Sequence, residues 1–218
     1  MTTISPDKFL QMISGLDRSK RTIVAIAGAP GSGKSTFAEM LVDKLNRDEA
    51  GSAAVLPMDG FHFDDIVLEE RGHRPRKGAP HTFDIGGLRA TLERLKRNNE
   101  AFIASPVFDR SIEIARAGAR IIEKTISIIV VEGNYLLLDD PDWTPLREFF
   151  DISAYLDEPE SILEERLTAR WIGFGLEGEA FRAKMEDNDL PNVRLVLDKG
   201  GGGEDTFIIR SASAGADR

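Results

Sequence analysis

The chain has 218 residues, a formal net charge of -9 and no cysteine. This length suits a single α/β domain over residues 1–218 and is short for two. The negative charge argues against nucleic acid as the main partner, because DNA and RNA sites need a broad basic surface. The absence of cysteine excludes disulfides, thiolate catalysis and cysteine-based zinc sites. With no signal-peptide pattern and no apolar run of membrane length, we expect a cytoplasmic protein without membrane insertion.

The first elements in chain order are a helix and a strand. Ser5-Pro6-Asp7 is typical of a helix start, and Phe9, Leu10 and Ile13 form an apolar stripe before Gly15 ends the helix. The apolar run 22–27 then predicts a buried strand.

A glycine-rich segment, GAPGSGKS, follows that strand directly at residues 28–35. It fits the phosphate-binding pattern G-x-x-x-x-G-K-[ST], in which backbone N–H groups and the start of a helix face an anion. Lys34 can reach the β- and γ-phosphates, and Ser35 can offer its hydroxyl to Mg²⁺. The expected ATP-binding residues are Gly28, Ala29, Pro30, Gly31, Ser32, Gly33, Lys34, Ser35 and Thr36. The alternative is a glycine turn with an incidental lysine.

The rest of the chain alternates strand and helix patterns. Further strands are predicted at 53–58, 127–131, 152–156 and 206–209, with helical patterns over 36–45, 88–95 and 162–170. This alternation predicts an α/β fold with a doubly wound, mainly parallel sheet of five strands, helices on both faces and ligands beyond the carboxyl ends of the strands. The tail at about 211–218 carries little to bury, and we expect it to be loosely held.

Two carboxylates end predicted strands at the same edge. Asp59 follows the second strand, and we interpret it as the base that orients an alcohol and takes its proton late; the alternative is a turn cap before Gly60. Glu132 closes the most apolar strand, where an acidic side chain is costly unless it meets water or a cation. It is a candidate magnesium ligand together with Ser35, or else a solvated carboxylate at the rim.

Arg166 and Arg170 lie four residues apart on a predicted helix, a spacing of like charges that favours an anionic ligand. We expect them to act in catalysis by closing over the triphosphate from a helical lid at about 164–182. Alternatively, neighbouring glutamates such as Glu158 neutralise them.

The segment 71–78 is a basic island in an acidic chain, and Arg76 and Lys77 are its candidate acceptor-binding residues. The alternative is a solvated loop. His62, His73 and His81 fall nearby without zinc-type spacing, so no metal site is predicted there.

Taken together, the motifs GAPGSGKS, MDGFHFD, RPRKGAPHTFD, PVFDR, VVEGNYLLL and NDLPN resemble those of the P-loop kinases of the uridine kinase, phosphoribulokinase and pantothenate kinase family. The chain looks most similar to bacterial proteins labelled fructose transport system kinases. The resemblance covers nearly the whole chain and implies the P-loop NTPase fold with ATP and Mg²⁺ as cofactors.

The resemblance also implies roles for individual residues. Asp59 matches the catalytic aspartate, Asp84 the aspartate that holds acceptor hydroxyls in nucleoside kinases, and residues 108–110 a segment lining their acceptor pocket. Phe108 stands where those enzymes have tyrosine, and residues 111–114 replace a histidine-containing stretch, which disfavours a nucleoside acceptor. The expected acceptor-binding set is Asp59, His62, Arg76, Lys77, Asp84, Phe108, Asp109, Arg110, Asn134 and Asn188. For Asn188, as for Asn192, the alternative is a turn and helix cap around Pro191.

The expected activity is transfer of the γ-phosphoryl group of ATP to a hydroxyl of a small metabolite, with a sugar of fructose type first. The acceptor alternatives are pantothenate-like or nucleoside alcohols. A different class of function is a nucleotide-binding regulatory or transport-associated ATPase. Whether the chain forms a homodimer stays open.

Overall fold

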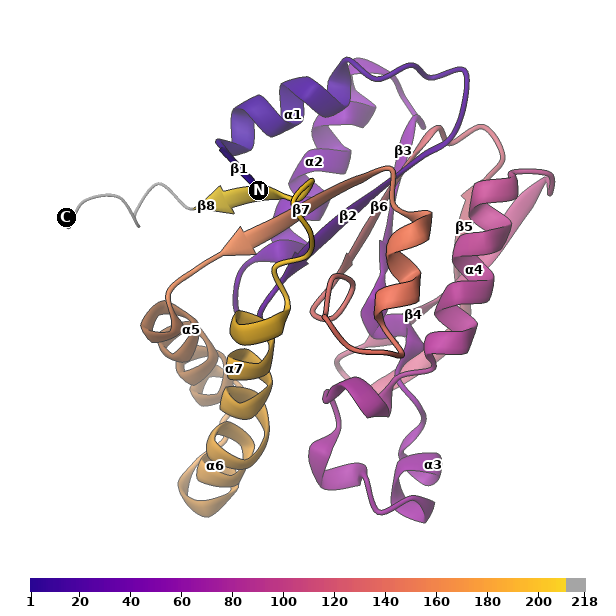
Figure 1. The fold of residues 1–218 in the computed structure, drawn as a ribbon. Helices are drawn as coiled ribbons and strands as arrows, with labels where there is room; N and C mark the ends of the chain where they lie inside the picture. Colours follow the sequence, from indigo (N-terminus) through magenta and orange to yellow (C-terminus); the bar gives the residue numbers. More distant parts are fainter. Residues whose placement is uncertain (211–218) are drawn as a thin grey trace.

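The computed structural model describes residues 1–210, so the tail predicted at 211–218 lies outside the described residues. The main sheet has six strands, all paired in parallel, in the order β1-β8-β7-β2-β6-β3 (Figure 1). These strands are β1 (Thr2–Ile4), β2 (Thr22–Gly28), β3 (Ala53–Pro57), β6 (Ile128–Gly133), β7 (Ile152–Asp157) and β8 (Phe207–Arg210). A separate antiparallel pair consists of β4 (Phe102–Asp109) and β5 (Ile114–Glu123).

Helices cover both faces of the sheet, as the doubly wound prediction requires. The helices are α1 (Pro6–Ser14), α2 (Lys34–Asp48), α3 (Asp65–Glu70), α4 (Ile85–Arg97), α5 (Glu160–Gly173), α6 (Gly178–Lys184) and α7 (Leu190–Lys199). One apolar cluster joins α1 and α2 to one face, through side chains such as Phe9 and Leu41. A second cluster, with Leu92 and Val193, joins α4 and α7 to the other face.

The two central strands explain why the sheet is parallel and covered. Every residue of β6 is buried, and so is every residue of β2 after Thr22. Continuous apolar runs of this kind suit strands that are packed on both faces. The α/β fold class is confirmed, but the prediction of five strands is wrong in number, because Thr2–Ile4 adds a sixth strand beside β8.

The β4–β5 hairpin was not predicted as a pair of strands. Most of β5 is exposed on both sides, so its sequence lacks the alternation that marks a half-buried strand. The hairpin packs against the 3₁₀ turn Met58–Phe61 that follows β3. It therefore forms a wall beside the carboxyl end of the sheet.

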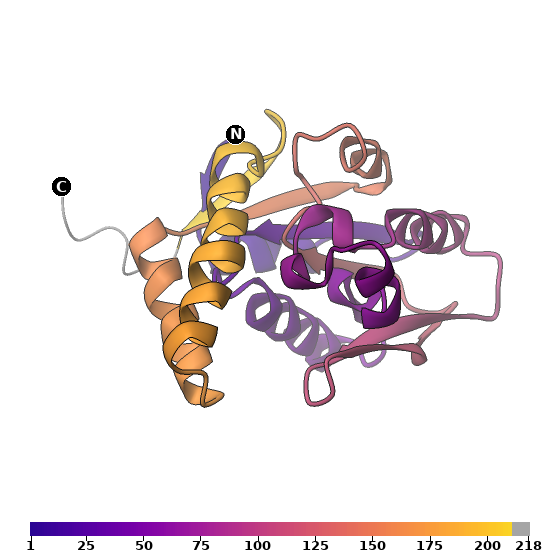
Figure 2. The same ribbon diagram turned by 90° about the horizontal axis from the view of Figure 1, so that it is seen from below.

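Two groups of elements extend beyond that end of the sheet. Figure 1 shows α5, α6 and α7 as one group and the segment around α3 as another. Seen from below in Figure 2, the α3 segment lies beside the group of three helices. Among residues 1–210, none of the helices combines the length and the apolar composition needed to cross a bilayer.

Candidate active site

The phosphate loop joins β2 to α2, as the sequence predicts. Gly31 and Gly33 have φ of 85° and 87°, values that favour glycine, and Gly33 is the residue before the first turn of α2. A side chain at Gly28 would also collide, because its Cβ would lie 2.6 Å from Ser32 Oγ. The loop thus brings the amino end of a helix to the edge of the sheet, an arrangement that binds phosphate.

Lys34 and Ser35 open α2 and face two carboxylates. Lys34 is buried, and burial lowers its pKa while the charges of Glu132 and Asp59 oppose the shift. Ser35 Oγ donates to Glu132 Oε2 at 3.0 Å. Burial raises the pKa of Glu132 to about 7, against the pull of Lys34.

Asp59 lies in the 3₁₀ turn after β3, across from the phosphate loop. Arg110, at the end of β4, donates from Nη2 to Asp59 Oδ2 at 2.7 Å. Burial opposes the charge on Asp59, but the effects of the neighbouring His62, Arg110 and Lys34 together outweigh burial and hold the pKa of Asp59 below its ordinary value. The carboxylate is therefore ionised at neutral pH, with one oxygen held by arginine.

A cluster of aromatic rings lies beside Asp59. The His62 ring lies between Phe83 and Phe108, with centroids 4.0 and 4.8 Å away. His62 Nδ1 is 2.8 Å from the carbonyl oxygen of Asp59, and since a carbonyl only accepts, Nδ1 carries the proton. Burial lowers the pKa of His62, while the charge of Asp59 opposes this shift.

The two arginines of α5 face different spaces. Arg166 Nη1 lies 3.2 Å from the Gly31 carbonyl oxygen and 3.5 Å from Glu158 Oε1, so the glutamate pairing considered from the sequence is present. Arg170 instead lines the space around Asp59, and burial, followed by the charge of Arg110, lowers its pKa.

These groups line a central cavity of about 120 Å³, with residues from the phosphate loop, the β4–β5 hairpin and the α5–α7 region. Its lining from the predicted site is Pro30, Gly31, Lys34, Ser35, Asp59, His62, Lys77, Phe108, Arg110, Asn134 and Arg170. A side cavity of about 470 Å³ adjoins the other side of the loop. It is lined by Gly31, Ser32, Gly33 and Thr36 and by the apolar side chains of Phe37, Met40, Leu156 and Ile209.

Some predicted acceptor residues have other partners. The Asp84 carboxylate accepts from Gly87 N at 2.8 Å and caps α4, outside the lining of the central cavity. Asp109 accepts from Ser111 Oγ at 2.6 Å. Both side chains are thus engaged in local structure, which the sequence motif alone does not reveal.

Two further members of the predicted acceptor-binding set connect the basic segment 71–78 to the region around the start of α7. Arg76 donates to the Asp187 carbonyl and, at 3.0 Å, to Asn192 Oδ1. Asn188 donates to the Lys77 carbonyl at 2.8 Å and lies in a π-helical turn, Met185–Asp189. The turn runs directly into α7, so the alternative of a turn and helix cap around Pro191 does not describe this part of the chain.

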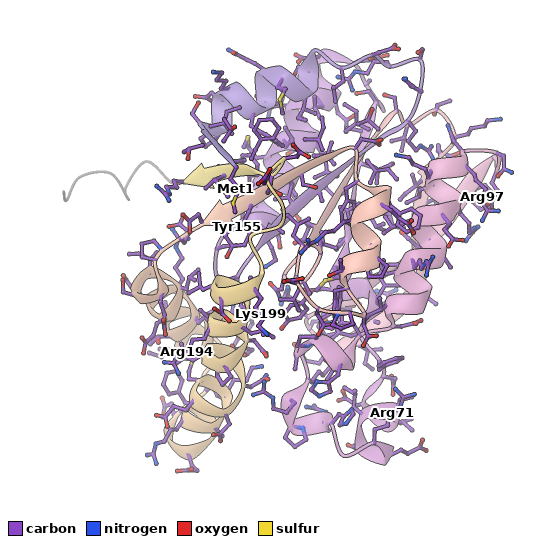
Figure 3. The ribbon with its side chains drawn as sticks, in the orientation of Figure 1. Met1, Arg71, Arg97, Tyr155, Arg194 and Lys199 are labelled. Atoms are coloured by element: carbon purple, nitrogen blue, oxygen red, sulfur yellow. The ribbon has the colours of Figure 1, made fainter. Side chains whose placement is uncertain are left out.

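The cavity residues on the α5–α7 side that the sequence does not identify include Trp171, Lys184 and Asp189. Trp171 Nε1 donates to Asp189 Oδ2 at 2.7 Å, and Lys184 Nζ lies 3.0 Å from Asp189 Oδ1. A π-helical turn often marks a functional site, but its irregular bonding has no sequence signature. Figure 3 labels Arg194 on α7 and Arg71 just after α3, one on each of the two groups of elements that extend beyond the carboxyl end of the sheet.

A phosphate loop at the carboxyl edge of a parallel sheet, with an ionised carboxylate across the cavity, defines the P-loop kinase class. Residues 23–168 match the family model described as "Phosphoribulokinase / Uridine kinase family". The chain belongs to this family, and it is accordingly a kinase.

Individual relatives carry different names. A crystal structure described as a "putative fructose transport system kinase" from Silicibacter sp. TM1040 superposes with a TM-score of 0.84 and 39% identity, covering 94% of this chain and 98% of that one. A "Putative uridine kinase" of Schizosaccharomyces pombe is 34% identical over 83% of this chain and 80% of its own length. A "Pantothenate kinase" of Yersinia enterocolitica is 31% identical over 70% of this chain, which spans half of that protein.

Proposed function

We propose that the protein transfers the γ-phosphoryl group of ATP to a hydroxyl of a small sugar-like metabolite. The observation that carries this proposal is the shared cavity of Lys34 and Asp59. A lysine that can bind the terminal phosphates and a carboxylate that can bind an alcohol face one space, and phosphoryl transfer needs the phosphate and the attacking hydroxyl side by side.

The proposed binding of ATP follows from the structure of the phosphate loop. Its backbone amides and Lys34 would bind the phosphates, while the apolar side cavity would hold the nucleoside part. Arg166 borders that side cavity and contacts the loop carbonyls, so it would link nucleotide binding to the position of α5. Helices α5 and α6 would then act as the predicted lid.

The donor set of Ser35 and Glu132 fits Mg²⁺. Two neighbouring ligands of an octahedral site with bonds of about 2.1 Å are about 3.0 Å apart, and the two side-chain oxygens are 3.0 Å apart. Both are oxygen ligands, as Mg²⁺ prefers. When bound there, Mg²⁺ would supply positive charge that offsets the negative charge of the phosphates.

The acceptor half centres on Asp59. Its ionised carboxylate would accept the hydrogen bond of the attacking hydroxyl and take the proton as the new P–O bond forms and the bond to ADP breaks. Arg110 and Arg170 would stabilise the charge on the transferred group. Both line the central cavity with Asp59.

The test offers ATP and Mg²⁺ with sugars, polyols, nucleosides and pantothenate, and follows ADP together with new phosphoester by ³¹P NMR. We expect stoichiometric ADP and phosphoester with a sugar or polyol. In Asp59→Asn, nucleotide binding should persist while transfer falls by about 10²- to 10⁴-fold. ADP release without phosphoester from any compound would instead favour a regulatory or transport-associated ATPase.

A further inference from the structure

The basic segment 71–78 borders the acceptor side of the cavity, yet its cations are engaged within the protein. Arg74 Nε lies 2.8 Å from Asp65 Oδ2. Arg76 donates to Asn192 and to the Asp187 carbonyl, and Arg71 stacks on the ring of Phe63 at 4.7 Å. These cations therefore organise the loop and its neighbours.

Lys77 is the member of this segment that lines the central cavity. Its side chain is only 9% exposed, and Nζ donates to Asp65 Oδ1 and to the Glu113 carbonyl oxygen, both at 2.6 Å. The ammonium also lies 5.3 Å from the centroid of the Phe108 ring. Two of its three donors are thus used by this chain, as a buried ammonium requires.

The bond to Glu113 fixes the hairpin turn. Glu113 has a φ of 56°, a left-handed conformation that is costly for a residue with a side chain. Lys77 holds its carbonyl, and the hairpin that this turn closes contributes Phe108 and Arg110 to the cavity wall. Lys77 therefore fastens α3 to the wall that an acceptor would contact.

The other cationic side chains that line the cavity either surround the point of phosphoryl transfer or pair with an acidic side chain. The charges of Lys34, Arg110 and Arg170 all act on Asp59, which places them around the point of transfer. Lys184 is paired with Asp189. Beyond the transfer point, the cavity is lined by Glu113 and by the aromatic rings of Phe83 and Phe108.

Building on the proposed function, we propose that the acceptor is an uncharged polyhydroxy compound. In this proposal, Lys77 positions the β4–β5 hairpin that contacts the acceptor and does not itself bind an anionic group. Carboxylates accept hydrogen bonds from hydroxyls and disfavour a second anion nearby. A phosphate or carboxylate on the acceptor would add a second anion near Asp59, while Lys77 and Lys184, which also line the cavity, are already paired with Asp65 and Asp189.

The first test compares acceptors that differ in charge. Fructose, ribulose and glycerol are assayed against fructose 6-phosphate, ribulose 5-phosphate, glycerate and pantothenate, with phosphoester as the readout. We expect kcat/KM at least about 100-fold higher for the best neutral compound. Preference for a charged compound would overturn this inference and leave the kinase proposal standing, whereas ADP without phosphoester throughout would contradict the kinase proposal itself.

The second test separates positioning from anion binding. Lys77→Gln should raise the KM for the best acceptor at least about 10-fold and leave the KM for ATP within about twofold, and Lys77→Arg should restore part of the loss. The matched control, Lys96→Gln, removes a lysine that pairs with Asp151 away from the cavity and should change neither constant.

Asp65→Asn keeps Lys77 but weakens its anchor, so it also serves if Lys77→Gln fails to fold. Positioning predicts a higher KM for the neutral acceptor in this variant as well. An anion-binding lysine would instead be released by the substitution, and the kcat/KM for a charged acceptor would rise. That rise, or unchanged acceptor constants in both variants, would refute the role of Lys77.

Discussion

The close approach of the catalytic turn to the hairpin yields a sharp prediction at Gly60. A Cβ at Gly60 would lie 2.4 Å from the carbonyl oxygen of Pro106, a backbone atom of β4. Ordinary contacts begin at about 3.4 Å, so in Gly60→Ala the turn and strand must separate by about 1 Å. Overpacking of this kind typically costs about 1–3 kcal/mol of unfolding free energy. Because Asp59 adjoins the displaced residue, a shift of about 1 Å should also lower kcat by about 100-fold.

Urea unfolding measures the first effect, and steady-state transfer to the best acceptor measures the second. The affinity for ATP should change little, since the phosphate loop is not displaced. Gly203→Ala is the matched control, because its Cβ would meet nothing within 4 Å. If Gly60→Ala were as stable and as active as the wild type, the close packing of the turn against β4 would not position Asp59.

Two other predictions concern buried polar groups. For Glu132, the pKa of about 7 in the folded protein lies above the unfolded value of 4.5. The wild type should therefore lose stability relative to Glu132→Gln as the pH rises from 4.5 to 7. At about 1.4 kcal/mol per pKa unit, the expected loss of unfolding free energy is about 3 kcal/mol. Urea unfolding of the nucleotide-free proteins across that range checks this, and a constant difference would contradict the raised pKa. For Asp189→Asn, loss of the charged partner should loosen Trp171 and increase acrylamide quenching of its fluorescence, while the buried Trp143 contributes a constant background. Unchanged quenching would show that the bond does not hold α5 in place.

Much of the nucleotide half could be predicted from sequence because its signals are local. The strand at 22–27, the glycine loop and the start of α2 are contiguous, and the loop pattern fixes their order. The buried strands ending near Asp59 and Glu132 are apolar runs that only a covered parallel sheet accommodates. Since parallel strands end at one edge, the approach of both carboxylates to Lys34 follows from topology.

The acceptor half depends on contacts between distant segments. Lys77 meets Asp65 and Glu113, the latter 36 positions away, and neither contact leaves a pattern along the chain. Asp84 shows the converse, because a motif that resembles an acceptor-binding aspartate also begins a helix, and its carboxylate caps that helix. Thr2–Ile4 is too short for periodicity to reveal a strand, and its pairing with β8 depends on tertiary structure.

The most direct test of the kinase mechanism is an experimental structure with Mg²⁺, a non-hydrolysable ATP analogue and the identified acceptor. The mechanism predicts the γ-phosphorus in the central cavity beside Lys34, with an acceptor hydroxyl about 3–3.5 Å from it and hydrogen-bonded to Asp59. A γ-phosphate directed away from Asp59, or an acceptor bound outside this cavity, would contradict it.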